Sequence, residues 1–254
     1  MVPLIMKIKL SVFTLTSIGI LITVLGCASA PQNNEPRMDS AEGTSMALPT
    51  ENSGLHVKKH VADVDPYQIA EVNASTTSFG GLGMKDCVIT VQFAPRDNTV
   101  ILLFSSQNNK MTVYLTPQNR ILMINGMKQY LDAFEQRTLE KGRGSEKTYG
   151  RTETTIEWSF FSVFTQVSQA FPKMQLGYEF FDRTPYFSLT FPDTDNVNYS
   201  AAGPNRIKKS VYMQLFFTRT QLESFGELML QEYLENTLKE QNIVTPETND
   251  RDVY

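Results

Sequence analysis

Short runs of apolar and polar residues, with a period close to two, begin at about residue 86. They are rich in β-branched and aromatic residues and are bounded by Pro, Asn, Asp and Gln, which is typical of strands separated by turns. Gaps of four to six residues favour antiparallel neighbours, because parallel strands need longer crossovers. The first four predicted strands are Cys87–Phe93, Thr99–Ser105, Met111–Thr116 and Arg120–Ile124.

A helix is predicted after these strands, where the apolar spacing changes to three and four residues. Asn125 is its expected N-cap and Gly142 its expected end. Its apolar face consists of Met127, Tyr130, Leu131, Phe134 and Thr138.

The second part of the chain repeats this order. The pattern predicts a long closing helix, which starts at a capping box formed by Thr220 and Glu223. The strands predicted before it are Arg151–Phe164, Met174–Phe181, Tyr186–Phe191 and Ile207–Thr218. The buried stripe of the helix is Leu222, Phe225, Met229, Leu230, Tyr233 and Leu234.

Strands followed by a helix predict an α+β fold, in which an antiparallel sheet of about eight strands carries two helices on one face. The globular domain is expected at residues 61–241, with a polar tail at 242–254. Duplication of a unit of four strands and one helix is an alternative interpretation, with halves at 85–142 and 148–241.

The amino-terminal segment has the layout of a secretory signal peptide. Lys7 and Lys9 precede an uncharged, mostly apolar stretch that ends at small residues. This stretch is marginal for a membrane span, which needs roughly 20 apolar residues. Residues 1–26 are therefore predicted to be a removable signal.

The end of this segment, Val24-Leu25-Gly26-Cys27, resembles the lipobox of bacterial lipoproteins. The resemblance covers the signal alone, and it implies cleavage after Gly26 and acylation of Cys27. Several acyl chains anchor a protein durably, since each buried methylene contributes about 0.8 kcal/mol. Ala28 follows the cysteine, and in Gram-negative lipoproteins a residue other than Asp there implies sorting to the outer membrane.

Residues 27–60 are then expected to be a lipidated, flexible tether, because they are rich in Pro, Asn, Ser, Glu and Thr without an apolar period. Cleavage removes Lys7 and Lys9 and no acid, which leaves 21 of 23 basic residues against 27 acidic ones, a net charge of −6. This balance argues against nonspecific binding to nucleic acid or to anionic lipid surfaces.

Candidate catalytic and metal-binding residues are sparse. Cys87 lies in an apolar run and is interpreted as a buried structural thiol. The two histidines, His56 and His60, lie at the edge of the tether without the zincin pattern. No catalytic residue, metal site or cofactor is predicted. The carboxylates considered for a hydrolase are Glu153, Glu157, Glu179 and Asp182, and the oxygens considered for a faint calcium loop are those of Asp193, Asp195 and Asn198.

Aromatic residues are concentrated in the second half, where 16 of the 27 lie between Trp158 and Phe225. Adjacent aromatic pairs place one ring on each face of a strand, so the second face needs a cover. The alternatives are a second packing layer, an apolar ligand cavity or a partner surface. The residues assigned to the latter two are Trp158, Phe160, Tyr178, Phe180, Tyr186 and Phe217.

Together these features predict a lipid-anchored protein of the bacterial cell envelope, at the outer membrane and facing the periplasm or the surface. The leading hypothesis is a non-enzymatic binding, assembly or scaffold module that engages an envelope protein. A carrier of an apolar ligand or lipid is the first alternative, and a carboxylate-dependent envelope hydrolase is the second.

The lipobox assignment gives a direct test. Replacement of Cys27 by Ser should leave the domain folded but abolish both membrane fractionation and incorporation of radiolabelled palmitate, because the thiol that carries the acyl chains is gone. A Cys27→Ser variant that stays membrane-bound and uncleaved would show that the segment is a membrane span instead.

Overall fold

Ten strands and three helices make up the part of the chain that the computed structural model describes, residues 59–77, 83–106, 108–141, 148–160, 167–203 and 205–241. These residues lie within one compact unit, Leu48–Tyr254. The predicted signal, Gly26, Cys27, the tether up to residue 58 and the tail at 242–254 lie outside the described residues.

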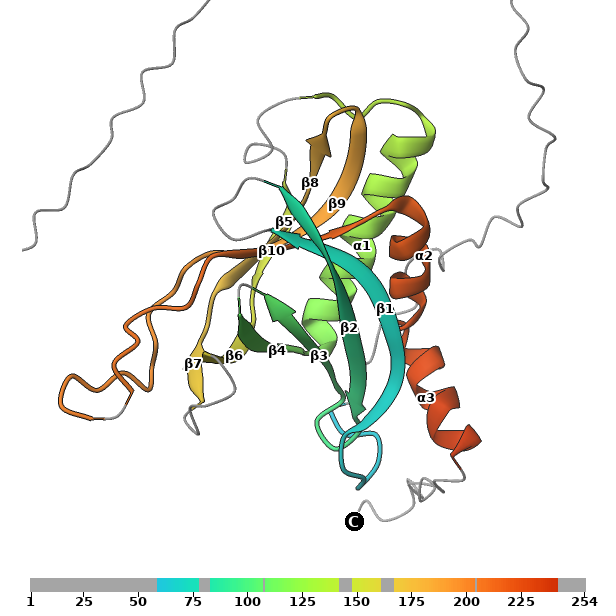
Figure 1. The fold of residues 1–254 in the computed structure, drawn as a ribbon. Coiled ribbons are helices and arrows are strands. Elements are labelled where there is room, and N and C mark those ends of the chain that lie inside the picture. Colours follow the sequence, from blue (N-terminus) through green and yellow to red (C-terminus); the bar gives the residue numbers. More distant parts are fainter. Residues whose placement is uncertain are drawn as a thin grey trace, which may run out of the picture. The chain divides into compact units, whose positions relative to one another are not determined.

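The strands form one sheet in which every pair is antiparallel, in the order β5-β8-β9-β10-β1-β2-β3-β4-β6-β7 (Figure 1). Their bounds are β1 Tyr67–Thr77, β2 Met84–Ala94, β3 Thr99–Ser106, β4 Asn109–Leu115, β5 Thr148–Glu153, β6 Thr155–Phe160, β7 Ser168–Ala170, β8 Lys173–Phe181, β9 Thr184–Phe191 and β10 Met213–Phe217. The helices are α1 Pro117–Glu135, α2 Arg219–Glu227 and α3 Gln231–Glu240. The predicted antiparallel α+β fold is confirmed.

The helices cover one face of the sheet. Strand side chains alternate between faces, and along β4 this places Met111, Val113 and Leu115 in the core and Lys110 on the other side. The same core receives residues from each helix: Met123, Met127, Tyr130, Leu222, Phe225, Leu234 and Leu238.

The sheet is curled, and its two ends belong to a single bent hairpin. Glu153 of β5 pairs with Lys173 of β8, and Ile156 of β6 pairs with Ala170 of β7. The two pairings have the same register, so β5 and β6 form one side of the hairpin and β7 and β8 form the other. The strand β5–β6 is interrupted at Thr154, whose N–H donates to the Pro172 carbonyl at 3.1 Å. Since β6 also pairs with β4, and β8 with β9, this hairpin joins both edges of the curled sheet.

The first helix begins earlier than the sequence predicts, and the predicted strand Arg120–Ile124 is wrong. Thr116 is the N-cap of α1, its hydroxyl accepting from the Asn119 N–H at 3.3 Å, and Pro117 occupies the first turn. The fixed φ of proline suits that position, whose N–H has no helical partner in any case. This cap, and not Asn125, starts the helix.

The single closing helix predicted from Thr220 is also wrong, because α2 and α3 are separate helices. The Thr218 hydroxyl caps α2 and accepts from the Gln221 N–H at 3.3 Å. The Met229 carbonyl, between the two helices, accepts a hydrogen bond from the Arg120 side chain at 3.0 Å. It therefore has a tertiary partner in place of a helical one.

Three further differences raise the predicted eight strands to ten. Strands β1 and β7 were not expected, and the expected strand Arg151–Phe164 is divided at Thr154 into β5 and β6. Of the expected strand Ile207–Thr218, only Met213–Phe217 belongs to the sheet. Four strands and one helix are followed by six strands and two helices, so the order differs from two equal copies.

A buried arginine connects three parts of this fold. Arg120 on α1 is 3% exposed, and its guanidinium donates to the Met229 carbonyl, to Asn98 in the β2–β3 turn and to the Gln231 side chain of α3. Burial lowers the pKa of this guanidinium to about 10, which still leaves it charged at neutral pH. Its hydrogen bonds to Met229 and Asn98 are buried, and the one to Gln231 is partly buried.

Truncation of this side chain should therefore be costly. We expect Arg120→Ala to lower the free energy of unfolding by about 3 kcal/mol, since several buried acceptors lose their donor at once. Arg219→Ala is the matched control, because the ion pairs of Arg219 with Glu135 and Glu223 are solvent-exposed and should contribute at most about 1 kcal/mol. Denaturant unfolding measures both, and an equal loss in the two variants would contradict the assigned role.

Candidate functional site

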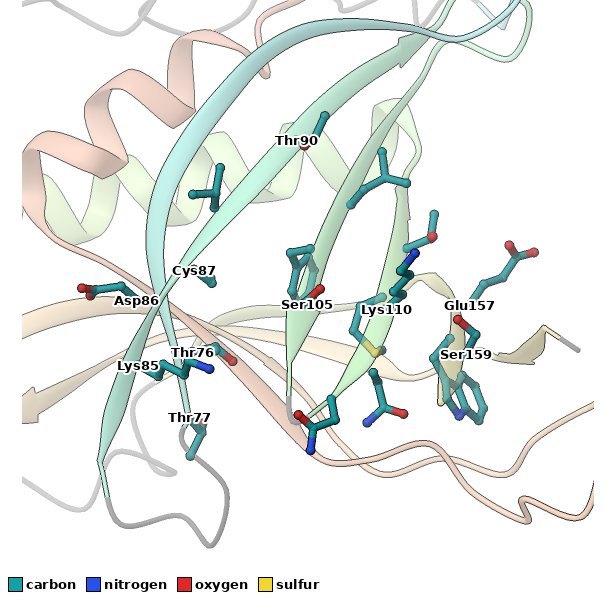
Figure 2. Close-up of a pocket in the computed structure, with 18 of the residues that line it drawn as sticks. Thr76, Thr77, Lys85, Asp86, Cys87, Thr90, Ser105, Lys110, Glu157 and Ser159 are labelled. Carbon is teal, nitrogen blue, oxygen red and sulfur yellow. The ribbon is translucent and has the colours of Figure 1, made fainter. Parts of the chain in front are cut away.

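Strands β2 and β3 separate at one end, and the gap between them forms the candidate site. Their pairing runs from Ala94↔Thr99 to Thr90↔Leu103 and stops there. Strand β2 continues to Met84, paired with β1 along this whole stretch. Figure 2 shows the two strands diverging, with Cys87 and Thr90 on β2, Ser105 on β3 and Lys110 on β4.

The gap holds a cavity of about 920 Å³, which we call the β2–β3 groove. Its walls come from β2 on one side and from the β3–β4 hairpin and β6 on the other. The described residues that line it are Thr76, Thr77, Lys85, Asp86, Cys87, Val88, Thr90, Leu103, Phe104, Ser105, Asn108, Asn109, Lys110, Met111, Thr112, Glu157, Trp158, Ser159 and Val167.

The groove runs between strands and does not lie on one face of the sheet. Sequence neighbours on a strand point to opposite faces, yet both members of the pairs Cys87 and Val88, and Leu103 and Phe104, line it. At its base, the Thr76 hydroxyl of β1 lies 3.0 Å from the buried Ser106 hydroxyl of β3. This hydrogen bond holds β1 against β3 below the divergence.

Charged side chains surround the apolar ones. Lys85, Asp86 and Lys110 are exposed, and Glu157 on β6 is partly buried. The carboxylate of Glu157 accepts from the Tyr114 hydroxyl at 2.9 Å and from the Gln169 amide at 3.3 Å. The groove can therefore accept a ligand with both apolar and polar groups.

These contacts also affect Tyr114. Burial, together with the hydrogen bond to the negatively charged Glu157, raises the pKa of the Tyr114 hydroxyl to about 12. The hydroxyl is thus a hydrogen-bond donor at neutral pH. Both oxygens of Glu157 have partners within the sheet, which suits a carboxylate that orders the wall of the groove.

Cys87 lines the groove but its thiol is deactivated. Burial raises the pKa of this thiol, and the negative charge of Asp86 adds to the effect, so that the pKa rises from 9.0 to about 11. The thiolate is the reactive form, and it is scarce at neutral pH. Cys87 therefore serves as a small apolar side chain in the wall, although it is only partly buried and the sequence predicts a buried thiol.

The six aromatic residues selected from the sequence do not form one surface. Trp158 is buried, and among the five whose side chains the structure describes it is the only one that borders the groove. Phe217 stacks on Phe225 of α2 with ring centroids 4.7 Å apart. The side chain of Phe160 lies outside the described residues.

The other three aromatic residues are divided between the faces of β8 and β9. The rings of Tyr178 and Phe180 are in contact, with their centroids 6.0 Å apart, and both pack against the helix-covered core. Tyr186 is on the opposite face, where it contacts Phe181 at 5.8 Å. Phe181 in turn contacts the buried Phe216 at 4.9 Å. Rings on both faces thus pack against other rings.

The carboxylates and histidines are also dispersed. Glu153 ends β5, Glu179 accepts from the Gln214 amide, and Asp182 lies in the β8–β9 turn. The imidazole Nδ1 of His60 is 3.0 Å from the Arg96 carbonyl, and His56 is outside the described residues. Within the described ranges, no group of three or more His, Cys, Asp and Glu side chains is arranged to hold a metal ion.

The calcium-like run lies between β9 and β10. The Asp193 carboxylate pairs with Lys209 at 3.2 Å. Asp195 forms an isolated bridge with Lys209, and the Asn198 amide donates to the Val167 carbonyl at 3.3 Å. The bridge of Asp195 is made by its backbone, and within the described ranges these side chains do not form a metal-holding group.

The deactivated thiol can be tested by alkylation. At about pH 8, iodoacetamide should modify Cys87 about a hundredfold more slowly than an ordinary thiol, because its pKa of about 11 lies two units above 9.0. The rate should rise about tenfold per pH unit until the pKa is reached, and Asp86→Asn should accelerate it. Mass spectrometry of the peptide containing Cys87 measures the alkylation rate. A rate equal to that of an ordinary thiol would show that the Cys87 thiol is not deactivated.

Comparison with known proteins places this fold in a family. A protein of Treponema pallidum (strain Nichols), described as "Uncharacterized protein", is 26% identical over 199 residues, which cover 76% of this chain and 71% of the relative. No solved structure matches the chain. A family model described as "Uncharacterised Treponema protein" matches residues 64–236, which include all ten strands, α1 and α2. The chain therefore belongs to the family of that description.

Proposed function

We propose that this chain is a lipid-anchored, non-enzymatic binding module of the bacterial cell envelope, and that its β2–β3 groove accepts an extended segment of an envelope protein. The anchor is the lipidated Cys27, and the location is the outer membrane, facing the periplasm or the surface. The groove exposes a stretch of the β2 edge that has no strand partner on that side among the described residues.

The observation that carries this proposal is the end of strand pairing at Thr90↔Leu103. In the described part of the chain, Met84–Ile89 of β2 pair with β1 alone. An unpaired strand edge is a template for another strand, since its N–H and C=O groups need partners. At about 3.4 Å per residue, this edge offers roughly 20 Å to an added strand.

The lining of the groove fits a polypeptide. Apolar side chains such as Val88 and Met111 alternate with hydroxyls and with both signs of charge. An extended peptide likewise presents alternate side chains to opposite sides. Main-chain hydrogen bonds to β2 would supply affinity, and the side-chain contacts would supply selectivity.

A carrier of an apolar ligand is the second candidate, supported by the size of the groove and by Leu103, Phe104, Met111 and Trp158 in its wall. Small-molecule sites are usually enclosed and mostly apolar. The exposed charges of Lys85, Asp86 and Lys110 favour the polypeptide over this alternative.

The anchor rests on the lipobox at Val24-Leu25-Gly26-Cys27. No helix in the described ranges combines the length and apolarity needed to cross a membrane. The matched relative comes from a bacterium, and the lipobox is a bacterial signal. A non-enzymatic role is supported by the raised pKa of the Cys87 thiol and by the hydrogen bonds that occupy both oxygens of Glu157.

The test uses the full chain carrying Cys27→Ser and a random peptide library displayed on phage. Val88→Lys should weaken the binding of selected peptides at least about tenfold, or about 1.4 kcal/mol, because it places a charge in the groove wall. Val197→Lys is the matched control, since the two valines are 52% and 53% exposed and Val197 is outside the groove. Bound peptide should also slow amide hydrogen exchange at Met84–Ile89.

Two results would contradict the proposal. Equal peptide binding by both valine variants would show that the groove is not the site. Stoichiometric lipid in the purified chain, lost in Val88→Lys and retained in Val197→Lys, would establish the carrier in its place.

A further inference from the structure

The segment between β9 and β10, residues 192–212, forms an arm that extends beyond the sheet, past β7 and away from the helices (Figure 1). It continues the β9–β10 hairpin by backbone hydrogen bonds. The Ser210 N–H donates to the Thr194 carbonyl at 2.8 Å, and the Asn196 N–H donates to the Lys208 carbonyl at 2.8 Å. The arm is therefore an ordered, two-stranded projection at its base.

A buried asparagine fixes the arm to β7. The Asn196 side-chain oxygen accepts from the Gln169 N–H at 3.2 Å and the Asn198 N–H at 3.0 Å. Its amide donates to the Ile207 carbonyl at 2.8 Å, and the Val197 N–H donates to the Gln169 carbonyl at 2.9 Å. The far part of the arm is thus presented from a fixed base.

Beyond this base, the arm exposes apolar side chains. Val197 is 53%, Tyr199 38% and Ile207 39% exposed, and Val167, whose carbonyl accepts from Asn198, is 51% exposed. With Tyr212 at the end of the arm, five of the seven exposed large hydrophobic side chains of the described chain therefore belong to the arm or touch it. Clustered exposure of this kind marks an interaction surface.

The charge of the arm differs from that of the chain. Residues 197–208 contain Arg206 and Lys208 and no acid, whereas the whole chain carries −4. Both cations are exposed, and the Lys208 ammonium lies 5.9 Å from the centre of the Tyr199 ring. Of the two acids nearer the sheet, Asp193 is paired with Lys209 and Asp195 is exposed, so that residues 192–212 carry three cations against two acids. The exposed end of the arm is therefore both cationic and apolar.

We propose that this arm docks on a phospholipid surface, with Val197, Tyr199 and Ile207 at the boundary of headgroups and acyl chains and with Arg206 and Lys208 on lipid phosphates. Tyrosine and cationic side chains are favoured at that boundary, where apolar and charged partners lie within a few ångströms. The net negative charge of the chain does not oppose this contact, because potentials fall off within about 10 Å and the arm projects from the domain.

This inference rests on the proposed anchoring in one respect. A few apolar side chains and two cations bind a bilayer weakly by themselves. Each cation contributes a binding free energy of about 1 kcal/mol. A chain already held to the same membrane turns this contact into an intramolecular one, so that a weak affinity suffices. The arm would then set the orientation of the tethered domain.

The experiment uses the chain from Ala28 onward with Cys87→Ser, held on vesicles by an amino-terminal hexahistidine tag bound to nickel-chelating lipid. An environment-sensitive fluorophore is attached at Val197→Cys, or at Val88→Cys as the matched control. In vesicles of phosphatidylcholine and phosphatidylglycerol, the emission at position 197 should shift to the blue and be quenched by spin-labelled lipid. The emission at position 88 should not change, and Arg206→Glu combined with Lys208→Glu should abolish the shift.

Two outcomes would overturn the proposal. One is emission at position 197 that is the same with and without vesicles. The other is a blue shift without lipid that grows with protein concentration, which would identify a second copy of the chain as the occupant. Because anchoring in this assay does not use acylation, failure of Cys27 lipidation in cells would leave the docking result intact, and the reverse also holds.

Discussion

The bent hairpin formed by β5, β6, β7 and β8 is the constraint on which the rest of the structure depends. Because one half of the hairpin pairs with β4 and the other with β9, the two edges of the sheet are tied to each other. Closing a sheet fixes the tilt and stagger of its strands. The curl is therefore set by backbone pairing, and the helices fill one side of a surface whose curvature is already defined.

Arg120 adds a second constraint, made by side-chain hydrogen bonds. Its guanidinium holds α1, the β2–β3 turn and the start of α3 in one arrangement. A buried cation surrounded by carbonyl and amide oxygens imposes direction as well as contact, since each hydrogen bond needs its own geometry. Through Asn98, Arg120 holds the turn that joins β2 to β3. This turn is at the paired end of the two strands, opposite to the end where they diverge.

Much of the fold can be predicted from the sequence, because strands such as β3 and β4 carry a clear two-residue alternation and short turns. The errors have local causes. The run around Arg120 and Ile124 is too short to distinguish a strand from a buried helix, and only the cap at Thr116 decides it. The break before α3 depends on the bond from Arg120 to Met229, 109 residues apart. Sequence periodicity cannot show such a contact.

The groove was harder to predict than the fold. It has no motif, because it arises where one register ends, at Thr90↔Leu103. In the sequence, the apolar run at Cys87 indicates a strand but not a divergence. The aromatic residues are the stronger sequence signal, yet among the five of the six whose side chains the structure describes, only Trp158 reaches the groove.

The narrow junction between β1 and β10 has a mechanical consequence. These strands pair at two positions, Ser75↔Phe216 and Thr76↔Leu215, and β10 is the direct continuation of the arm. Thr76 also forms the hydrogen bond to Ser106 at the base of the groove. A pull on the arm would load β9 and β10 together, and because β10 is held to β1 at only these two positions, the seam beside Thr76 would be the weaker of its two strand pairings.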